Sequence, residues 1–169
     1  RCFPEGKIKV LTMSYDDGRE PDKRLISLFN KYRIKGSFHL NSGLLKDAPP
    51  TPNDVYGLRI PKEEIPEVFK GHEVSCHTTT HPTIARSPIG HVAKEIIEDR
   101  EKLEEIVGYT VRGLSYPNGS FSDEIKNILP SLGIEYARVV DTTGTLEMPR
   151  DFLEWKGTCR HVDPNLLKY

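Results

Sequence analysis

Apolar and polar residues follow two different periods along this chain, and the period changes at glycines, prolines and aspartates. Short, mostly apolar runs that end in turn residues are typical of buried strands. These runs predict strands over residues 8–15, 37–40, 72–75, 113–116 and 134–140. The first run leads directly into Asp16-Asp17-Gly18, so we expect a strand that enters a turn there.

Longer segments between these runs carry apolar residues three or four positions apart, which is the spacing of an amphipathic helix. One helix is predicted from Pro21 up to Gly36, with an apolar face made of Leu25, Leu28, Phe29 and Tyr32. Further helices are predicted over residues 62–70, over residues 88–107 with Gly108 ending the helix, and over residues 122–132 with Ser122 as the cap. Residues 41–61 are crowded with Pro, Gly, Asn and Asp, which indicates a long surface loop.

Strands therefore alternate with helices, and this order predicts an α/β fold with a parallel sheet, or a barrel with its helices outside. A length of 169 residues suits one domain with a sizeable core, so we treat residues 1–169 as a single unit. Active sites of α/β barrels gather where the strands end. Residues just after each predicted strand are therefore the main candidates for function.

The charge balance narrows the choice of partner. The 24 Lys and Arg residues against 25 Asp and Glu residues give a net charge of -1, which argues against nucleic acid or an anionic membrane. No apolar run approaches the roughly 20 residues that span a bilayer. No signal peptide is visible, so we expect a soluble protein that is cytoplasmic, or exported with its signal outside this chain. The expected partner is a neutral small molecule or polymer.

Two adjacent carboxylates, Asp16 and Asp17, follow the first predicted strand. Aspartate and glycine are ordinary turn residues, so this motif taken by itself is a weak signal. Neighbouring carboxylates repel each other unless a cation or a proton lies between them. A metal on Asp17 would remove that cost and leave Asp16 close to a metal-bound water, as its base.

Two histidines, His77 and His81, lie four residues apart just after the third predicted strand. This spacing lets two imidazoles reach one ion, and the three threonines between them favour a tight turn over a helix. One Asp and two His can hold zinc while its fourth position stays open for water. No Glu follows His77, which argues against the zinc-protease pattern and leaves Asp16 as the candidate base.

Three later positions are weaker candidates. Asn118, between Pro117 and Gly119, suits a sharp turn that exposes a backbone N–H to an oxyanion. The segment from Asp151 to Trp155 has two interpretations. In one, a carboxylate orients an active-site residue beside an aromatic wall. In the other, Asp151 and Glu154 are a solvated acidic pair and Trp155 is a core residue. His161 lies near Trp155 in the sequence and could reach a cleft as a proton donor.

Together these residues resemble the polysaccharide deacetylases, the NodB-homology family also called carbohydrate esterase family four. Ser14-Tyr15-Asp16-Asp17-Gly18 resembles the first motif of that family, usually Thr-Phe-Asp-Asp-Gly, and the segment from His77 to His81 matches its second, His-Ser/Thr-x-x-His. The resemblance extends from about Val10 to Trp155. It implies a distorted (β/α) barrel with fewer than eight regular strands, and a hydrolase that removes N- or O-acetyl groups from a sugar.

The resemblance also implies roles for single residues. Zinc would be bound by Asp17, His77 and His81, Asp16 would be the general base, and Asn118 and Tyr116 would lie at the oxyanion and substrate. Ser115 replaces the Arg of the third motif, Arg-x-Pro-x-Gly. In the family that Arg pairs with a carboxylate of the fourth motif, Asp-x-x-Asp-Trp. Its variant here contains Asp151, Glu154 and Trp155, and we expect Asp151 and Trp155 to contact substrate.

The fifth family motif, Leu-x-His, carries the general acid, and it is not found before the chain stops at Tyr169. One interpretation is that the domain lacks its C-terminal elements, since a barrel without its last strands has an open sheet edge. The other is that His161 serves as the acid. We favour the first interpretation and keep His161 as the candidate acid within this chain.

The expected partner is thus an acetylated sugar or oligosaccharide, and the expected cofactor is zinc, although Asp and His ligands also accept cobalt or nickel. Two alternatives stay open. One is a hydrolase of a non-sugar amide, and the other is a carbohydrate-binding module that has lost catalysis. The sequence indicates neither the sugar nor the oligomeric state.

Overall fold

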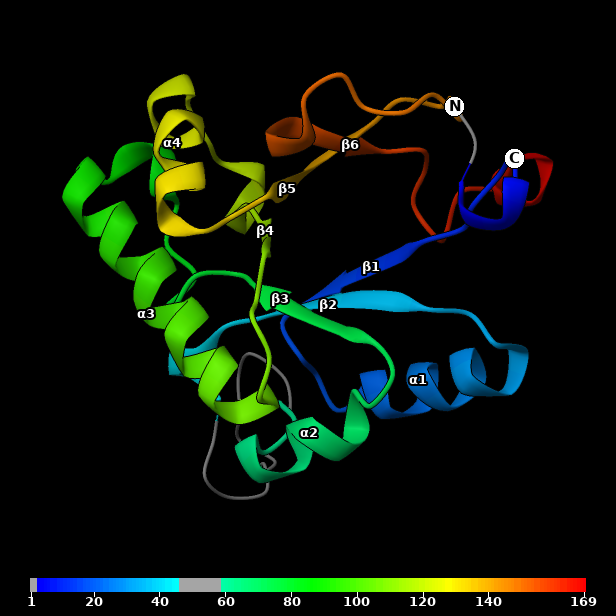
Figure 1. Ribbon diagram of the computed structural model, residues 1–169, viewed down its shortest axis with the longest axis horizontal. Helices are drawn as coiled ribbons and strands as arrows, with labels where there is room; N and C mark the ends of the chain where they lie inside the picture. The colour runs from blue at the N-terminus through cyan, green and yellow to red at the C-terminus, as the bar shows by residue number, and fades with distance from the viewer. Residues whose placement is uncertain (1–2, 46–58) are drawn as a thin grey trace.

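Six short strands form one sheet in the order β1-β2-β3-β4-β5-β6, and every neighbouring pair is parallel. The computed structural model describes residues 3–45 and 59–169. The strands are β1 (Met13–Asp16), β2 (Gly36–Leu40), β3 (Glu73–Cys76), β4 (Gly113–Ser115), β5 (Tyr136–Thr142) and β6 (Trp155–Gly157). The helices are α1 (Pro21–Tyr32), α2 (Ile65–Val68), α3 (Ile89–Val107) and α4 (Asp123–Ile128), and Figure 1 shows them on the outside of the sheet.

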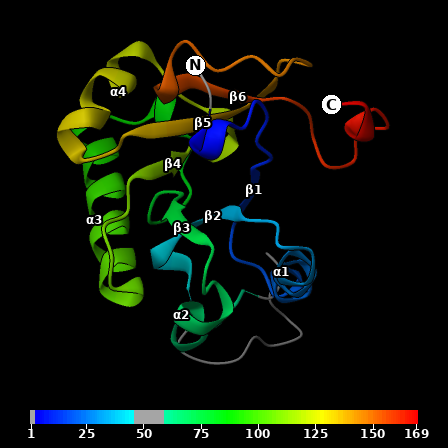
Figure 2. The ribbon, with the colours of Figure 1, turned by 45° about the vertical axis from the view of Figure 1, so that its right-hand side comes forward.

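The sheet is strongly curled. In a flat sheet β1 and β5 would lie about 19 Å apart, because neighbouring strands are about 4.8 Å apart. Instead, Nη2 of Arg138 on β5 lies 2.5 Å from Oδ1 of Asp16 on β1. β1 and β6 are the two edge strands of this curl, which Figure 2 shows from a second direction. The expected distorted barrel with fewer than eight regular strands is confirmed.

The two faces of the sheet differ in chemistry. The outer face, which the helices cover, carries buried apolar residues at alternate strand positions: Phe38, Leu40, Val74, Leu114, Ala137 and Val139. The inner face carries the residues between them, which are mostly polar: Ser14, Asp16, His39, Ser75, Ser115 and Arg138. Side chains in a strand alternate between faces, so one short strand serves both the core and a polar surface.

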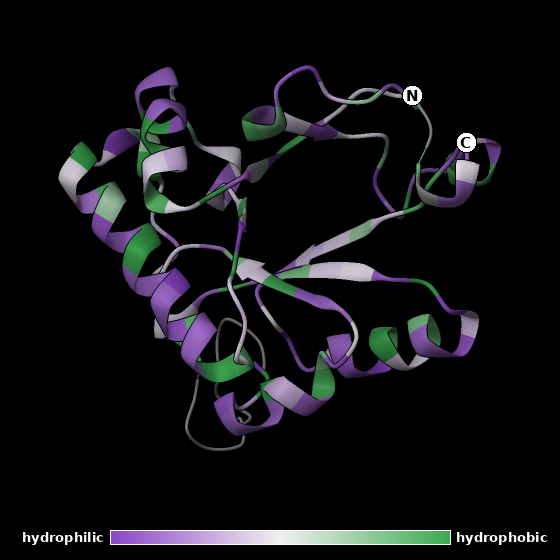
Figure 3. Cartoon of the chain, viewed as in Figure 1, coloured by the Kyte–Doolittle hydropathy of each residue, from purple (hydrophilic) through white to green (hydrophobic). Residues whose placement is uncertain are grey.

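Helix α3 covers the outer face with an apolar stripe in which Val92, Ile96 and Leu103 are buried. Hydrophobic and hydrophilic residues alternate along this helix in Figure 3, as expected from its sequence. The predicted end of this helix at Gly108 is confirmed, because that glycine takes the left-handed conformation of a helix C-cap. The predicted cap of α4 is confirmed too, since the Ser122 hydroxyl accepts a hydrogen bond from the Ile125 N–H.

Two predicted elements were wrong in detail. The first strand begins at Met13 rather than Ile8, which is 82% exposed, because the apolar residues before Met13 have no packing partner in the core. The apolar face of α1 is also rotated. Phe29 is buried as expected together with Ile26, whereas Leu28 and Tyr32 are exposed. Of the predicted loop over residues 41–61, the part from 46 to 58 lies outside the described residues.

No helix within residues 3–45 and 59–169 is long and apolar enough to cross a membrane.

Candidate metal centre

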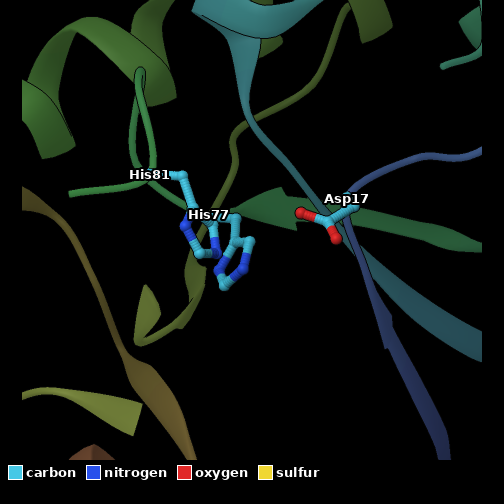
Figure 4. Close-up of side chains that lie close together, drawn as sticks. All are labelled: Asp17, His77 and His81. Atoms are coloured by element: carbon cyan, nitrogen blue, oxygen red, sulfur yellow. The ribbon is translucent and has the colours of Figure 1, made fainter. Parts of the chain in front are cut away.

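Asp17, His77 and His81 come together at one end of the sheet, just beyond the last residues of β1 and β3 (Figure 4). Each offers a ligand atom, and these atoms all lie within 4.8 Å of one another. The two imidazole rings are nearly perpendicular, with centroids 4.7 Å apart. Parallel strands deliver their C-terminal residues to the same edge, and for this reason residues sixty positions apart in the sequence share a site.

His77 is oriented by a hydrogen bond to the backbone. Its Nδ1 lies 2.7 Å from the carbonyl oxygen of Ser115, which can only accept, so Nδ1 carries the proton. Nε2 is then left with a lone pair, which is the arrangement found in metal-binding histidines. Burial lowers the pKa of His77. The ring is therefore held neutral, as a metal ligand requires.

The segment between the two histidines is an irregular turn, as the three threonines led us to expect. Helix α3 holds it through two buried acids. The Asp99 carboxylate accepts hydrogen bonds from the N–H groups of His77 (2.9 Å) and Ser42 (2.7 Å). The Glu95 carboxylate accepts one from the N–H of Thr80 (2.8 Å). The loop is thus tied to α3, whose Asp99 and Glu95 are buried.

Asp99 is not among the predicted site residues, although the sequence contains a signal for it. It occupies a position in the apolar stripe of α3 between Ile96 and Leu103, and it is fully buried. Burial raises the pKa of Asp99 to about 7, while the two N–H donors act in the opposite direction. A carboxyl group at a core position has to be hydrogen-bonded. A search for polar residues in the helix stripe would have found it.

Backbone strain concentrates around the three ligands. Asp17 (φ 79°), Thr78 (φ 64°), His81 (φ 61°) and Asn118 (φ 58°) all have left-handed conformations. Such residues cost about 1–3 kcal/mol each and persist where the surrounding structure holds them. Asn41 holds Thr78 in this conformation, because its side-chain amide donates to the Thr78 carbonyl oxygen at 2.9 Å. Asn41 is a second supporting residue that sequence analysis missed.

Two arginines flank Asp17. Nη2 of Arg19 lies 2.8 Å from Oδ2 of Asp17, and Nη2 of Arg59 lies 3.4 Å from Oδ1. Arg59 also donates to the backbone carbonyl oxygen of Asp17, and it is 7% exposed. Each carboxylate oxygen has two lone pairs, so these contacts leave acceptor capacity for a cation.

Asp16 points to the inner face next to this cluster. Nη2 of Arg138 lies 2.5 Å from both of its carboxylate oxygens. Burial by itself raises the pKa of Asp16, but the nearby imidazole of His77 and the charged guanidinium of Arg138, which also donates hydrogen bonds to the carboxylate, outweigh it and bring the pKa to about 2. Asp16 is therefore ionised at neutral pH. Arg138 is not among the predicted site residues, because it lies 122 positions away from Asp16 in the sequence.

The Asn118 turn lies after β4, where it was expected. The Asn118 side chain is exposed and donates to the Thr83 hydroxyl at 3.2 Å, while the N–H of Gly119 bonds within the turn. The side chain of Tyr116 is 1% exposed, and its hydroxyl donates to the Leu153 carbonyl oxygen. The Tyr116 phenol is therefore part of the core, and contact of Tyr116 with a substrate stays a prediction.

The residues of the fourth motif are turned toward α4. Nζ of Lys126 on that helix lies 3.0 Å from Asp151 and 2.9 Å from Glu154. This lysine supplies the positive charge for both acids, and hydrogen bonds from Lys126 lower the pKa of Asp151. Trp155 is half-buried, with its ring against Tyr136 and Phe152. Contact of Asp151 and Trp155 with a substrate stays a prediction.

The structure does not bring His161 to the three ligands. Its ring packs on Tyr15, with centroids 5.6 Å apart, and Tyr15 also packs on Phe29 of α1. Tyr15 and Asp16 are consecutive strand residues, so their side chains point to opposite faces of the sheet. His161 therefore lies by the helix-covered face. This position does not support its expected role as general acid.

The cluster fits a divalent transition metal on chemical grounds. Two neutral imidazoles and one carboxylate are a donor set that zinc accepts, and three protein ligands leave a position for water. His77 has the protonation state for binding, and Asp17 has spare lone pairs. Among the described residues, this is the group of His, Cys, Asp and Glu side chains placed to hold an ion.

Comparison with known proteins gives consistent results. A family model described as polysaccharide deacetylase matches residues 4–137. The chain is 26% identical over 121 residues to a peptidoglycan-N-acetylmuramic acid deacetylase of Bacillus subtilis, covering 70% of the chain and 23% of that protein. It is 25% identical over 129 residues to chitin deacetylase 1 of Cryptococcus neoformans, covering 74% of the chain and 24% of that protein. The chain thus spans about a quarter of the length of these relatives.

The fold is similar to that of a Streptococcus pyogenes deacetylase solved in complex with acetate. The TM-score is 0.72 at 17% identity, and the match covers 83% of this chain and 59% of the other.

Proposed function

Because this chain belongs to the polysaccharide deacetylase family, we propose that it is a metal-dependent hydrolase that removes acetyl groups from a carbohydrate. The observation that carries the proposal is the cluster of Asp17, His77 and His81, whose ligand atoms lie within 4.8 Å of one another. Asp16 next to this cluster provides an ionised carboxylate that is not itself one of the three. The proposal therefore draws both the metal ligands and the base of a one-metal hydrolase from residues of this chain.

In this proposal Asp17, His77 and His81 hold the ion. A zinc ion held there would polarise a carbonyl group and lower the pKa of water to about 7. Asp16 accepts the proton of the attacking water, as a general base. The backbone N–H of Asn118 would donate to the oxyanion of the acetyl group, since fixed donors of this kind stabilise developing negative charge.

The substrate class follows from the matched relatives by analogy. One name refers to N-acetylmuramic acid of peptidoglycan, and the other refers to chitin. Peptidoglycan and chitin are both polymers of N-acetylated amino sugars. We therefore place N-acetylated sugars ahead of O-acetylated sugars and of non-sugar amides. A net charge of -1 suits a neutral polymer better than an anionic one.

The test combines metal analysis with acetate release. Purified protein should contain about one transition-metal ion per chain. It should also release acetate from N-acetylglucosamine oligomers or peptidoglycan. Chelation should abolish the release, and added zinc should restore it. Acetate release from acetylated xylan tests O-acetylated sugars, and acetate release from a simple aromatic acetamide tests non-sugar amides.

Two variants separate metal binding from base catalysis. Asp17→Ala should lose both the metal and the activity. Asp16→Asn should keep the metal but lose about 100- to 10,000-fold in kcat, the usual contribution of a general base. Full acetate release by a metal-free Asp17→Ala protein would overturn the proposal.

A carbohydrate-binding module without catalysis is the second candidate. The position of His161 favours it, because the ring packs on Tyr15 on the face opposite to Asp16. Binding of acetylated oligosaccharide with no acetate released over hours, in the zinc-loaded protein, would select this candidate.

A further inference from the structure

Arg138 on β5 contacts side chains of β1 and β4 on the inner face. Its Nη2 lies 2.5 Å from both carboxylate oxygens of Asp16 and 2.8 Å from the Ser115 hydroxyl. Its Nε lies 2.8 Å from the Ser14 hydroxyl. One guanidinium therefore joins β1, β4 and β5. Its side chain is 20% exposed, and that of Asp16 is 30% exposed.

The strand register explains how Arg138 reaches this place. Ser115 on β4 and Arg138 on β5 are paired across neighbouring strands, so their side chains stand side by side on the same face. Ser115 is the residue that replaces the Arg of the third family motif. It is small, and its hydroxyl touches the guanidinium. The positive charge missing from β4 is thus present one strand away.

We propose that Arg138, which lies on β5 beside Ser115 of β4, is the positioning residue for Asp16. This inference rests on the proposed function, in which Asp16 is the general base. Arg138 does not touch the acetyl group. It acts by holding the Asp16 carboxylate in one orientation beside Asp17.

The contacts suit this role in two ways. Asp16 and Asp17 are adjacent carboxylates that repel each other, and the guanidinium compensates the charge of Asp16 while Arg19 and Arg59 contact Asp17. A planar guanidinium also contacts several acceptors at fixed angles, whereas an ammonium group is a point charge on a flexible stem. Lysine at position 138 should therefore keep the charge but not the orientation.

The competing explanation is that Arg138 only ties β5 to β1 and so keeps the sheet curled. Arg138→Ala, Arg138→Lys and the exchange variant Ser115→Arg/Arg138→Ser distinguish the two. Arg112→Ala is the matched control, because Arg112 lies just before β4 and pairs with the exposed Glu135. Each variant is examined for kcat, KM, bound zinc and thermal unfolding.

For a positioning role, Arg138→Ala should lower kcat about 100-fold, the effect of a small misplacement of a catalytic group. KM and bound zinc should change little. Millimolar guanidinium should restore part of the activity of Arg138→Ala but none of that of Asp16→Asn. The exchange variant should be more active than Arg138→Ala, and Arg138→Lys should stay impaired.

An unchanged kcat in a folded Arg138→Ala protein would overturn the inference. So would a loss that guanidinium and the exchange variant both fail to restore. Crystal structures of wild type and Arg138→Lys add a readout that needs no activity, because the inference requires the Asp16 carboxylate to leave its wild-type orientation. If the wild type releases no acetate at all, the proposed function fails, and the crystal structures still decide whether Arg138 orients Asp16.

Discussion

The outer and inner faces of the curled sheet are built from the same short strands, but one is packed with apolar side chains and the other carries hydrogen-bonded polar side chains. On the outer face Phe38 and Leu40 are packed under the helices. On the inner face, the neighbouring residue His39 contacts the hydroxyl of Ser14, which in turn contacts Arg138. The first face stabilises the fold by burial. The second holds polar side chains in fixed positions at the end where Asp17 and the two histidines meet.

The residues that stabilise the fold can therefore be changed separately from those that position the candidate site. Burial of an apolar side chain is worth about 1.5–3 kcal/mol and tolerates some change of shape. A hydrogen-bonded polar network contributes less net stability, but it fixes orientation. Variants on the outer face should therefore change unfolding more than the specific activity of folded protein, and variants on the inner face should do the opposite.

The largest effect on stability is expected at Phe38, which is 1% exposed and lies 4.9 Å from the ring of Phe69. Phe38→Ala should lower the free energy of unfolding by about 3–5 kcal/mol, because it leaves a cavity under α1 and α2. Urea denaturation measures this. The matched control is the neighbouring inner residue Ser37, for which Ser37→Ala should cost no more than about 1 kcal/mol. Equal costs at the two positions would break the comparison between faces.

An intermediate effect is expected from Asp22, a buried acid in the first turn of α1. Burial raises the pKa of Asp22 to about 6, although a hydrogen bond from the Arg19 N–H acts in the opposite direction. A folded-state pKa above the unfolded value of 3.8 means that the folded state binds more protons between these pH values. This contribution to stability is complete below about pH 4 and is lost as the pH rises through about 6.

Asp22→Asn should remove this dependence, and the difference should reach at most about 3 kcal/mol across the window. Denaturation of both proteins from pH 4 to 7 measures it. Parallel curves for Asp22→Asn and wild type would contradict the pKa shift.

The smallest effect is expected from the Ser75–Tyr136 pair of the inner face, whose hydroxyl groups lie 3.1 Å apart. Tyr136→Phe should cost about 1 kcal/mol, the net worth of one hydrogen bond. A double-mutant cycle with Ser75→Ala separates the energy of this hydrogen bond from the packing energy of the two side chains. A cost as large as that of Phe38→Ala would mean that the inner face also carries the stability of the fold.

Much of the architecture could be predicted from the sequence. Alternation of strand and helix patterns predicted the parallel α/β sheet, and the helix over residues 89–107 and the cap at Ser122 were placed almost to the residue. These features depend on local periodicity and capping, which the sequence states directly. The predicted start of β1 and the predicted apolar face of α1 were wrong, because burial depends on packing partners that are distant in the sequence.

The candidate site was predictable in part for the same reason. Asp16, Asp17, His77 and His81 stand in short motifs, and the sequence alone identified them as a group. Their supporting residues have no such motif. Asn41, Asp99 and Arg138 are ordinary polar residues in a loop, a helix and a strand, and they gain meaning only from what they touch.

The family, the order of the elements and the four residues at the ends of two strands could be identified from the sequence, because each depends on motifs or periodicity among neighbouring residues. The tertiary structure alone decided which arginine faces Asp16 and where His161 lies. Arg138 and Asp16 are 122 positions apart and meet because the sheet curls until β5 reaches β1. His161 lies apart from them because adjacent residues of a strand point to opposite faces, and its ring packs on Tyr15.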